Sequence, residues 1–276
     1  MRIQFWKLQS VGNDFPLVHP EDLPTGFDLS RLAVSICDRR FGVGGDGLLT
    51  LERVSGGLKM RMFNPDGTED FCGNGLRCAA IHAHAIGWAG DEFAIEHGGR
   101  AVRARVDPPV ASTVLGPASY QPSEVPLKQG VGELFLAPVF WDDEHTITGS
   151  ALTTGSTHVI IPVVSLPEDK ELVDQGRRIE HFGLYPARTS VIWRQELGTD
   201  HLRIRIWERG VGETWGCGTG SSAAAADYLR SEDRGGKVRV DNRGGTVCVE
   251  MAAWNAPITA SGPAEPVYCG EFRFPG

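Results

Sequence analysis

The chain has 276 residues, which is enough for two domains of ordinary size, and its formal net charge is −8. This acidic balance, with the basic residues scattered along the chain, argues against a nucleic-acid partner. No apolar run approaches the roughly 18 residues of a membrane-spanning helix, and the first residues have no signal-peptide core, so we expect a cytoplasmic protein without a membrane partner.

The first half of the chain predicts short strands and two helices. The strands are expected at residues 1–8, 48–52, 59–63 and 101–106, and the helices at 29–39 and from Gly73 to about Gly87. The turn at Asn13 either presents its side chain to a ligand or simply completes the turn. The glycine-rich loop at 42–47 precedes a strand rather than a helix, so it does not fit a dinucleotide-binding fingerprint.

The second half of the chain predicts a similar set of elements. Five prolines between residues 107 and 126 indicate a crossing between halves, and 177–182 indicates the end of a helix. Strands are expected at 132–140, 146–152, 158–164, 190–194, 202–207 and 246–250, and an alanine-rich helix follows Cys217. Each half therefore predicts a curled antiparallel sheet around one buried helix of small residues.

Two segments of the chain repeat each other. Cys72-Gly-Asn-Gly and Cys217-Gly-Thr-Gly each follow a polar loop and open an alanine-rich run, and the two cysteines lie 145 residues apart (217 minus 72). A Gly-Gly turn before a strand also recurs, at Gly99 and Gly245, with an offset of 146 (245 minus 99). Two matches at one offset indicate an internal duplication of about half the chain, too long for a solenoid repeat.

Each of these cysteines is expected at the start of a helix. Backbone N–H groups and the helix dipole there favour a thiolate, and the same N–H groups can hold a carboxylate. If the two loops face one substrate, one thiolate can remove an α-proton while the opposite thiol protonates the other face. The pair must then titrate jointly, and the scheme needs no pyridoxal phosphate.

Metal binding is not expected. Cys72 and Cys78 are six residues apart and so point to different faces of a helix, and no Cys-x-x-Cys occurs. His82 and His84 are better explained as structural residues than as ligands. The six cysteines of the chain are expected to be free thiols rather than a disulfide framework.

Five motifs together resemble the diaminopimelate epimerase family. They are Gly12-Asn-Asp-Phe15, Phe63-Asn-x-Asp-Gly67, Cys72-Gly-Asn-Gly-x-Arg77, Glu208-Arg-Gly-x-Gly-Glu-Thr214 and Cys217-Gly-Thr-Gly220. The resemblance implies an α+β fold of two pseudo-symmetric lobes, each a curled, mostly antiparallel β-barrel around a central helix. The lobes would be residues 1–116, with 265–276 returning to them, and residues 117–264, and the active site would lie in the cleft between them.

The resemblance also implies an activity, the cofactor-independent conversion of LL- to meso-diaminopimelate, a precursor of lysine and cell wall. Cys72 and Cys217 would be the catalytic base and acid, and His158 and Glu208 would tune them. Arg209 would pair with the far carboxylate and Glu208 with the far ammonium. The residues implied to bind substrate are Asn13, Asn64, Gly73, Asn74, Ser156, Ser190, Glu208, Arg209, Gly218 and Thr219. The partner would be a small amino acid, and a homodimer is left open.

Two departures from the family pattern leave the substrate open. Ser156 and Ser190 stand where the family usually has asparagines that serve the non-reacting end of diaminopimelate. A lost polar contact can cost about 1–3 kcal/mol, so either water fills the gap or another amino acid is the substrate. Phenazine-type isomerases and hydroxyproline dehydratases share the fold but lack one thiol. A non-catalytic amino-acid-binding protein and a structural zinc protein are the remaining alternatives.

Overall fold

The structure is a computed structural model that describes residues 1–275, and the chain forms two compact units. Unit 1 contains Met1–Val114 and the chain from Ser261 onwards, and unit 2 contains Leu115–Ala260. The chain therefore leaves unit 1 once and returns to it once.

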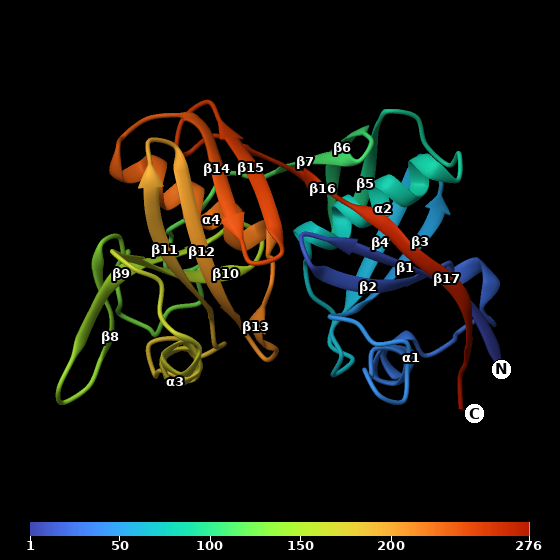
Figure 1. Cartoon of the computed structure of the whole chain (residues 1–276), viewed down its shortest axis with the longest axis horizontal. Helices are drawn as coiled ribbons and strands as arrows, with labels where there is room; N and C mark the ends of the chain where they lie inside the picture. Colours follow the sequence, from blue (N-terminus) through green and yellow to red (C-terminus); the bar gives the residue numbers. More distant parts are fainter. Residues whose placement is uncertain (276) are drawn as a thin grey trace. The chain divides into compact units, whose positions relative to one another are not determined.

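Unit 1 is a mixed sheet with two α-helices (Figure 1). Its pairing runs β17–β1–β2–β3–β4–β5–β6–β7, with parallel pairing only at β2–β3 and β4–β5. The elements are β1 (Arg2–Ser10), β2 (Asn13–Val18), the 3-10 helix η1 (Pro20–Asp22), α1 (Leu29–Ile36), β3 (Leu48–Val54), β4 (Gly57–Phe63), α2 (Gly73–Ala85), β5 (Glu92–His97), β6 (Arg100–Asp107), β7 (Val110–Leu115) and β17 (Glu265–Arg273).

Unit 2 repeats this plan. Its pairing runs β8–β9–β10–β11–β12–β14–β15, again with two parallel pairs, β10–β11 and β12–β14. The elements are β8 (Ala137–Trp141), β9 (Thr146–Thr153), β10 (Thr157–Val163), α3 (Asp169–Glu180), β11 (Ser190–Gly198), β12 (His201–Glu208), β13 (Gly212–Thr214), α4 (Gly218–Ser231), β14 (Gly236–Asn242) and β15 (Gly245–Met251); β16 (Ile258–Pro263) then carries the chain back to unit 1.

The two units share one topology. In each, a helix links the first parallel pair, α1 between β2 and β3 and α3 between β10 and β11. A second helix links the second pair, α2 between β4 and β5 and α4 between β12 and β14. Parallel neighbours need a crossover, and a helix supplies it. The predicted α+β fold with two pseudo-symmetric, mostly antiparallel lobes is confirmed, and the sheets are curled without closing.

The central helices α2 and α4 are enclosed almost completely. In α2 every residue from Gly73 to Ala83 is buried, and in α4 every residue from Gly218 to Leu229. Glycine and alanine dominate both sequences, so neighbouring strands can pack close to the helix backbone. The prediction of an enclosed small-residue helix in each half is confirmed.

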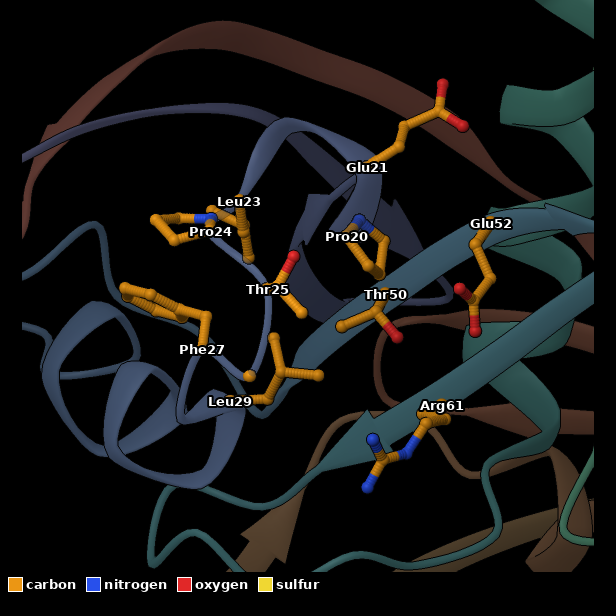
Figure 2. Close-up of a pocket in the computed structure, with 11 residues that line it drawn as sticks. Pro20, Glu21, Leu23, Pro24, Thr25, Phe27, Leu29, Thr50, Glu52 and Arg61 are labelled. Atoms are coloured by element: carbon orange, nitrogen blue, oxygen red, sulfur yellow. The ribbon is translucent and has the colours of Figure 1, made fainter.

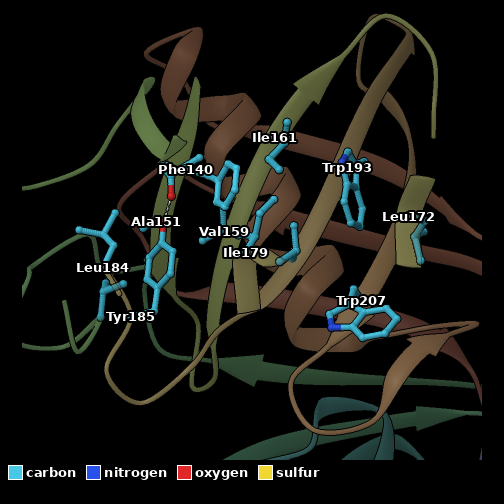
Figure 3. Packing of buried hydrophobic residues seen from close by; sticks show 13 residues of the cluster. Phe140, Ala151, Val159, Ile161, Leu172, Ile179, Leu184, Tyr185, Trp193 and Trp207 are labelled. Carbon is cyan, nitrogen blue, oxygen red and sulfur yellow. Dashed lines mark hydrogen bonds between the residues drawn. The ribbon is translucent and has the colours of Figure 1, made fainter. Parts of the chain in front are cut away.

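The outer helices α1 and α3 cover separate hydrophobic cores. Asp28 caps α1 by accepting a hydrogen bond from the backbone N–H of Arg31 at 3.0 Å, and Leu32 and Ile36 are buried beneath it. In unit 2, Leu172 and Ile179 of α3 lie among a cluster that includes Trp193 and Trp207 (Figure 3). Each amphipathic helix thus seals a core on one face of its sheet.

Two element boundaries predicted from the sequence were wrong. Residues 132–136 are not a strand, because Leu136 has φ of 47° and breaks the extended chain before β8 begins. The proline-rich stretch contains the predicted crossing, because the chain passes from unit 1 to unit 2 after Val114, and its first part forms β7, paired with β6. The helix expected to end at 177–182 is α3, whose beginning at Asp169 was not predicted, and α1 ends at Ile36 rather than Arg39.

None of the helices within residues 1–275 has the length and apolar character that crossing a bilayer requires.

Candidate active site

Cys72 is the N-cap residue of α2. Its backbone is extended, with φ −135° and ψ 109°, and its Sγ accepts a hydrogen bond from the backbone N–H of Gly75 at 3.2 Å. A Cβ on Gly75 would lie 3.3 Å from this sulfur and 2.8 Å from a side-chain carbon of β3. The third residue after Cys72 must therefore be glycine for the sulfur to sit in the first turn. Donation from the helix start stabilises a thiolate here.

His97 fixes the backbone that carries Cys72. The N–H of Cys72 donates to Nε2 of His97 at 3.0 Å, so Nδ1 carries the proton and donates to the carbonyl of Met60 at 3.1 Å. Phe71 stacks on the imidazole, with centroids 4.6 Å apart and planes 23° apart. Burial lowers the pKa of His97, which favours the neutral ring that this pair of hydrogen bonds requires.

Asn13 and Asn74 are in direct contact beside Cys72. The side-chain amide of Asn74 donates to Oδ1 of Asn13 at 3.2 Å, and the amide of Asn13 donates to Oδ2 of Asp46. The same oxygen of Asp46 accepts the backbone N–H of Asp14 at 3.2 Å. The start of β2 and the start of α2 are thus held together by a chain of amides that ends on one carboxylate.

A charged cluster supports that carboxylate. Arg39 donates to Oδ1 of Asp46 and to Oδ1 of Asp14, both at 2.7 Å, and Lys7 lies 2.6 Å from Oδ2 of Asp14. Burial and the neighbouring Asp14 raise the pKa of Asp46, whereas the hydrogen bonds from Arg39 and Lys7 hold the pKa of Asp14 below its usual value despite burial. Of these residues only Asp46 belongs to the glycine-rich loop at 42–47, the loop that does not fit a dinucleotide-binding fingerprint.

Replacing Asp46 by asparagine is expected to lower kcat about 10- to 100-fold, because small displacements of positioning groups cost rates of this order. Asn13 would lose its ionic acceptor and turn away from Asn74. Steady-state kinetics together with the thermal midpoint would measure both effects. Asp91→Asn, at an exposed position in the same unit, is the control. An unchanged kcat in Asp46→Asn with an unchanged midpoint would contradict the positioning role.

Asn64 is bonded to Thr68 in the loop before Cys72. Its amide donates to Oγ1 of Thr68 at 3.0 Å, and its backbone N–H donates to the carbonyl of Thr68 at 2.7 Å. Asp66 accepts from both the N–H and the hydroxyl of Thr68. The side chain of Asn64 therefore organises the loop that runs to Cys72, and its contact with substrate stays a prediction.

Cys217 occupies the equivalent place in unit 2. It caps α4 with φ −142° and ψ 117°, and its Sγ accepts from the N–H of Gly220 at 3.3 Å. The hydroxyl of Thr219 also lies 3.3 Å from this sulfur, and the carbonyl of Thr219 accepts from the hydroxyl of Thr154 at 2.9 Å. A Cβ on Gly220 would lie 3.2 Å from the sulfur. The two cysteine sites are therefore built by the same local geometry.

The predicted residues Glu208, Arg209 and Ser190 lie at adjoining strand ends. The buried hydroxyl of Ser190, at the start of β11, accepts the backbone N–H of Arg209 at 3.1 Å. Glu208, at the end of β12, accepts from the hydroxyl of Thr214 at 2.7 Å. The guanidinium of Arg209 donates to the carbonyl of Ala187 at 3.4 Å. Ser190 therefore positions the backbone that carries Arg209.

His158 is buried next to these residues. It pairs with Ser190 in the parallel register of β10 and β11, and its side chain is 1% exposed. Burial, with a smaller effect from Arg209, lowers the pKa of His158 to about 3. Neither ring nitrogen has a hydrogen-bond partner among residues 1–275, and neither does the buried hydroxyl of Thr157. Buried polar atoms without partners are characteristic of a site that receives water or ligand. Ser156, half-buried, accepts from the N–H of Thr154 at 3.2 Å.

Two other thiols, Cys37 and Cys78, are buried. Burial raises the pKa of Cys37 to about 12 and raises the pKa of the fully buried Cys78 still further. Within residues 1–275 the six cysteines are thiols that form no disulfide, as predicted. Three or more potential metal ligands gather nowhere in that range. His82, as predicted, is a structural residue, because its Nε2 lies 3.0 Å from Nε2 of buried His19.

The buried histidines predict acid sensitivity. Burial lowers the pKa of His82 to about 4 and that of His158 to about 3, from 6.5, so below pH 6.5 the unfolded chain takes up protons that the folded chain does not. Stability should therefore fall as the pH falls, by about 2 kcal/mol for each of these two histidines between pH 7.5 and pH 5. Urea unfolding across this range would measure it. His82→Gln should show a shallower slope, and exposed His145→Gln the wild-type slope; equal slopes in all three would contradict the assignment.

Two site residues were missed from the sequence. Asp46 lies 33 residues from Asn13, in the glycine-rich loop at 42–47, which from the sequence was tested only against a dinucleotide-binding fingerprint. His97 precedes the Gly98-Gly99 turn of the repeat, and the matching position in the second copy is Arg243, which cannot accept the N–H that His97 accepts. This difference between the two copies of the repeat was the signal in the sequence that could have identified His97 as a site residue.

Comparison with known proteins covers most of the chain. The family model described as diaminopimelate epimerase matches residues 5–113 and 150–267. A diaminopimelate epimerase from Moorella thermoacetica is 34% identical, with 98% of this chain and 99% of the relative covered. Those from Pelotomaculum thermopropionicum and Coxiella burnetii are 34% and 31% identical, with 99% of each chain covered.

Solved structures share the fold at low sequence identity. A hydroxyproline epimerase from Agrobacterium vitis, with bound trans-4-hydroxy-L-proline, superposes with a TM-score of 0.73 at 14% identity and covers 98% of this chain and 92% of its own. A phenazine biosynthesis protein of the PhzF family from Bacillus anthracis has a TM-score of 0.67 at 17% identity, with 98% and 99% covered.

Proposed function

This chain belongs to the diaminopimelate epimerase family, and we propose that it interconverts LL- and meso-diaminopimelate by inverting one α-carbon without a cofactor. The observation that carries the proposal is the duplicated cap: in each unit, a cysteine sulfur accepts an N–H from the first turn of a buried helix. Two thiols of matched geometry are the number that stereoinversion by two bases requires.

The proposed reaction moves one proton at each sulfur. The thiolate of one cysteine, Cys72 or Cys217, takes the α-proton, and the thiol of the other gives its proton to the opposite face of the same carbon. The electron pair of the broken C–H bond is delocalised onto the α-carboxylate and returns to carbon in the second transfer. The reaction leaves the two sulfurs in exchanged protonation states, so the reverse reaction starts from the product side.

We propose that the helix starts hold the reacting carboxylate. Backbone N–H groups of the first turn lack partners within a helix, and the dipole adds positive potential. The segments Gly73-Asn74 and Gly218-Thr219 supply these groups, and both are buried. The developing negative charge would meet donors that are already oriented, which is the most effective form of transition-state stabilisation.

The far end of the substrate is assigned to Arg209 and Glu208, which would pair with its carboxylate and its ammonium. Ser190 would help indirectly, by holding the backbone of Arg209. Ser156, His158, Asn13 and Asn64 complete the proposed set, and His158, neutral near pH 7, offers a hydrogen-bonding ring rather than a charge. Glu208 and His158 are proposed to tune the thiols.

A substrate panel in heavy water tests this function. LL-diaminopimelate, meso-diaminopimelate and single-carboxylate amino acids would be incubated in ²H₂O, with inversion and α-deuterium followed by NMR. Diaminopimelate should invert and take up one solvent deuterium for each inversion. Comparable rates for unrelated amino acids would support the alternative, a racemase of another amino acid. The reason to test it is that Ser156 and Ser190 replace asparagines of the family pattern. A non-catalytic binder would incorporate no deuterium at all.

The cellular setting follows from the thiols. Cys72 and Cys217 must stay reduced to exchange protons, so we propose a reducing compartment such as the cytoplasm. The homodimer stays a prediction, which a molar mass from light scattering would decide.

A further inference from the structure

Unit 1 contains a pocket of about 360 Å³ that none of the residues discussed above as catalytic or substrate-binding lines. Its walls come from η1, from the loop that leads to α1, and from β3 and β4. Figure 2 shows Thr25, Leu29 and Thr50 gathered in the middle, with Phe27 and Pro24 on one side and Glu52 and Arg61 on the other. Its volume lies at the small end of the range for small-molecule sites.

The charge of the pocket is set by Glu52. This half-buried carboxylate makes no hydrogen bond or ion pair with any of residues 1–275. Arg61, the cation of the pocket, is already committed, because its Nε and Nη2 donate to the two carboxylate oxygens of Glu69 at 3.0 and 2.8 Å. Glu21, which also lines the pocket, lies 3.6 Å from Arg53. Glu52 has only a longer-range attraction to Arg61, so Glu52 is the group that a cation complements.

The opposite wall is apolar. Leu23, Pro24, Phe27 and Leu29 supply ring and aliphatic surface, and Pro20 adds to it from η1. The hydroxyl of Thr50 stands between this wall and Glu52, so the polar groups converge at one end of the pocket. A ligand that matches both ends carries one cationic donor group and a short hydrocarbon arm.

We propose that this pocket is a second small-molecule site, which binds an aliphatic primary ammonium compound with the ammonium on Glu52 and the arm against Phe27 and Leu29. The pocket is connected to Cys72 through Arg61 and Glu69. Arg61 lines the pocket and holds Glu69, three residues before Cys72, in the loop that also bridges Phe63. An occupant that moves Arg61 moves the chain leading into α2.

The test uses n-hexylammonium as the probe, with n-hexanol and n-hexanoate as matched neutral and anionic compounds, each titrated into the full chain by calorimetry and ligand-observed NMR. The ammonium should bind saturably and at least about tenfold more tightly than the other two, the size expected for one charged hydrogen bond. Equal affinities of hexylammonium and hexanol, or no saturation by about 10 mM, the weak end of the affinity scale, would overturn the proposal.

Variants then locate the site. Glu52→Gln should lose at least about tenfold in affinity, whereas Glu92→Gln, an exposed glutamate of the same unit, should bind as wild type; equal binding by both variants would refute the site. Cys72→Ala should bind as wild type, which separates this site from the catalytic one. If circular dichroism shows that Glu52→Gln does not fold, Phe27→Ala replaces it. The affinity for hexylammonium should then fall by about tenfold, whereas the affinity for methylammonium should not change. An equal loss of affinity for both compounds would contradict the contact between the hydrocarbon arm and Phe27.

Discussion

Replacing Cys72 or Cys217 by alanine is expected to lower the rate of epimerisation by at least about a thousandfold, since each sulfur does the acid–base work on one face of the carbon. Neither variant should lose much stability, because the backbone of each cap residue is unchanged and a sulfur is a weak hydrogen-bond acceptor. Inversion of LL-diaminopimelate, followed by chiral chromatography, measures the loss.

The controls use the remaining thiols. Cys269→Ala removes an exposed thiol and should leave the rate unchanged, and Cys248→Ala should do the same. The two active-site variants should also differ from each other: each keeps one base, so each should still exchange the α-proton of only one of the two stereoisomers with ²H₂O. A variant that retains more than a few per cent of wild-type turnover, or exchanges both stereoisomers equally, would contradict the two-base scheme.

Replacing Arg209 by glutamine is expected to lower kcat/KM for diaminopimelate by about a hundredfold or more, because the far carboxylate would lose its charged partner. The backbone hydrogen bond from residue 209 to Ser190 does not involve the guanidinium and should survive the change. The fold should therefore persist, and the loss should appear in substrate recognition. Steady-state kinetics with diaminopimelate measures it.

A matched variant and a second substrate sharpen this result. Arg203→Gln removes an exposed arginine from β12, the strand that ends just before Arg209, and should behave as wild type. The slow racemisation of an amino acid with a single carboxylate should be insensitive to Arg209→Gln. An equal loss for both substrates would show that Arg209 acts on the reacting end, or on the thiols, instead.

The helix starts were predictable because their signals are local. A cysteine cap and the glycine that gives its sulfur room are three residues apart, so the motif alone specifies the contact between Cys72 and Gly75. The repeat at Cys217 and Gly220 gave the same signal a second time, and this duplication predicted the pseudo-symmetric fold. Strands with clear alternation, such as 202–207, were predicted for the same reason.

Elements that depend on packing were less predictable. α3 has charged residues throughout and buries only Leu172, Gly176, Ile179 and Glu180, so its sequence alone gave a weak apolar stripe. Its place is decided by Trp207, against which Gly176 packs so closely that a Cβ would lie 2.6 Å from the indole. The repeat could have indicated this helix as the counterpart of α1, because both link the first parallel strand pair of their unit.

The sequence by itself determined where the two thiols sit, that they occupy equivalent helix starts in a duplicated fold, and that acid–base chemistry on an amino acid suits them. Only the tertiary structure decided which residues hold the site around Cys72: His97 accepts the N–H of Cys72, and Asp46 accepts from the amide of Asn13. It also formed the pocket that Glu52 lines. The physical reason is the range of the interactions. Caps and turns are set by neighbours within one helical turn, whereas partners 25 or 33 residues away are brought together only when the sheet folds and buries them.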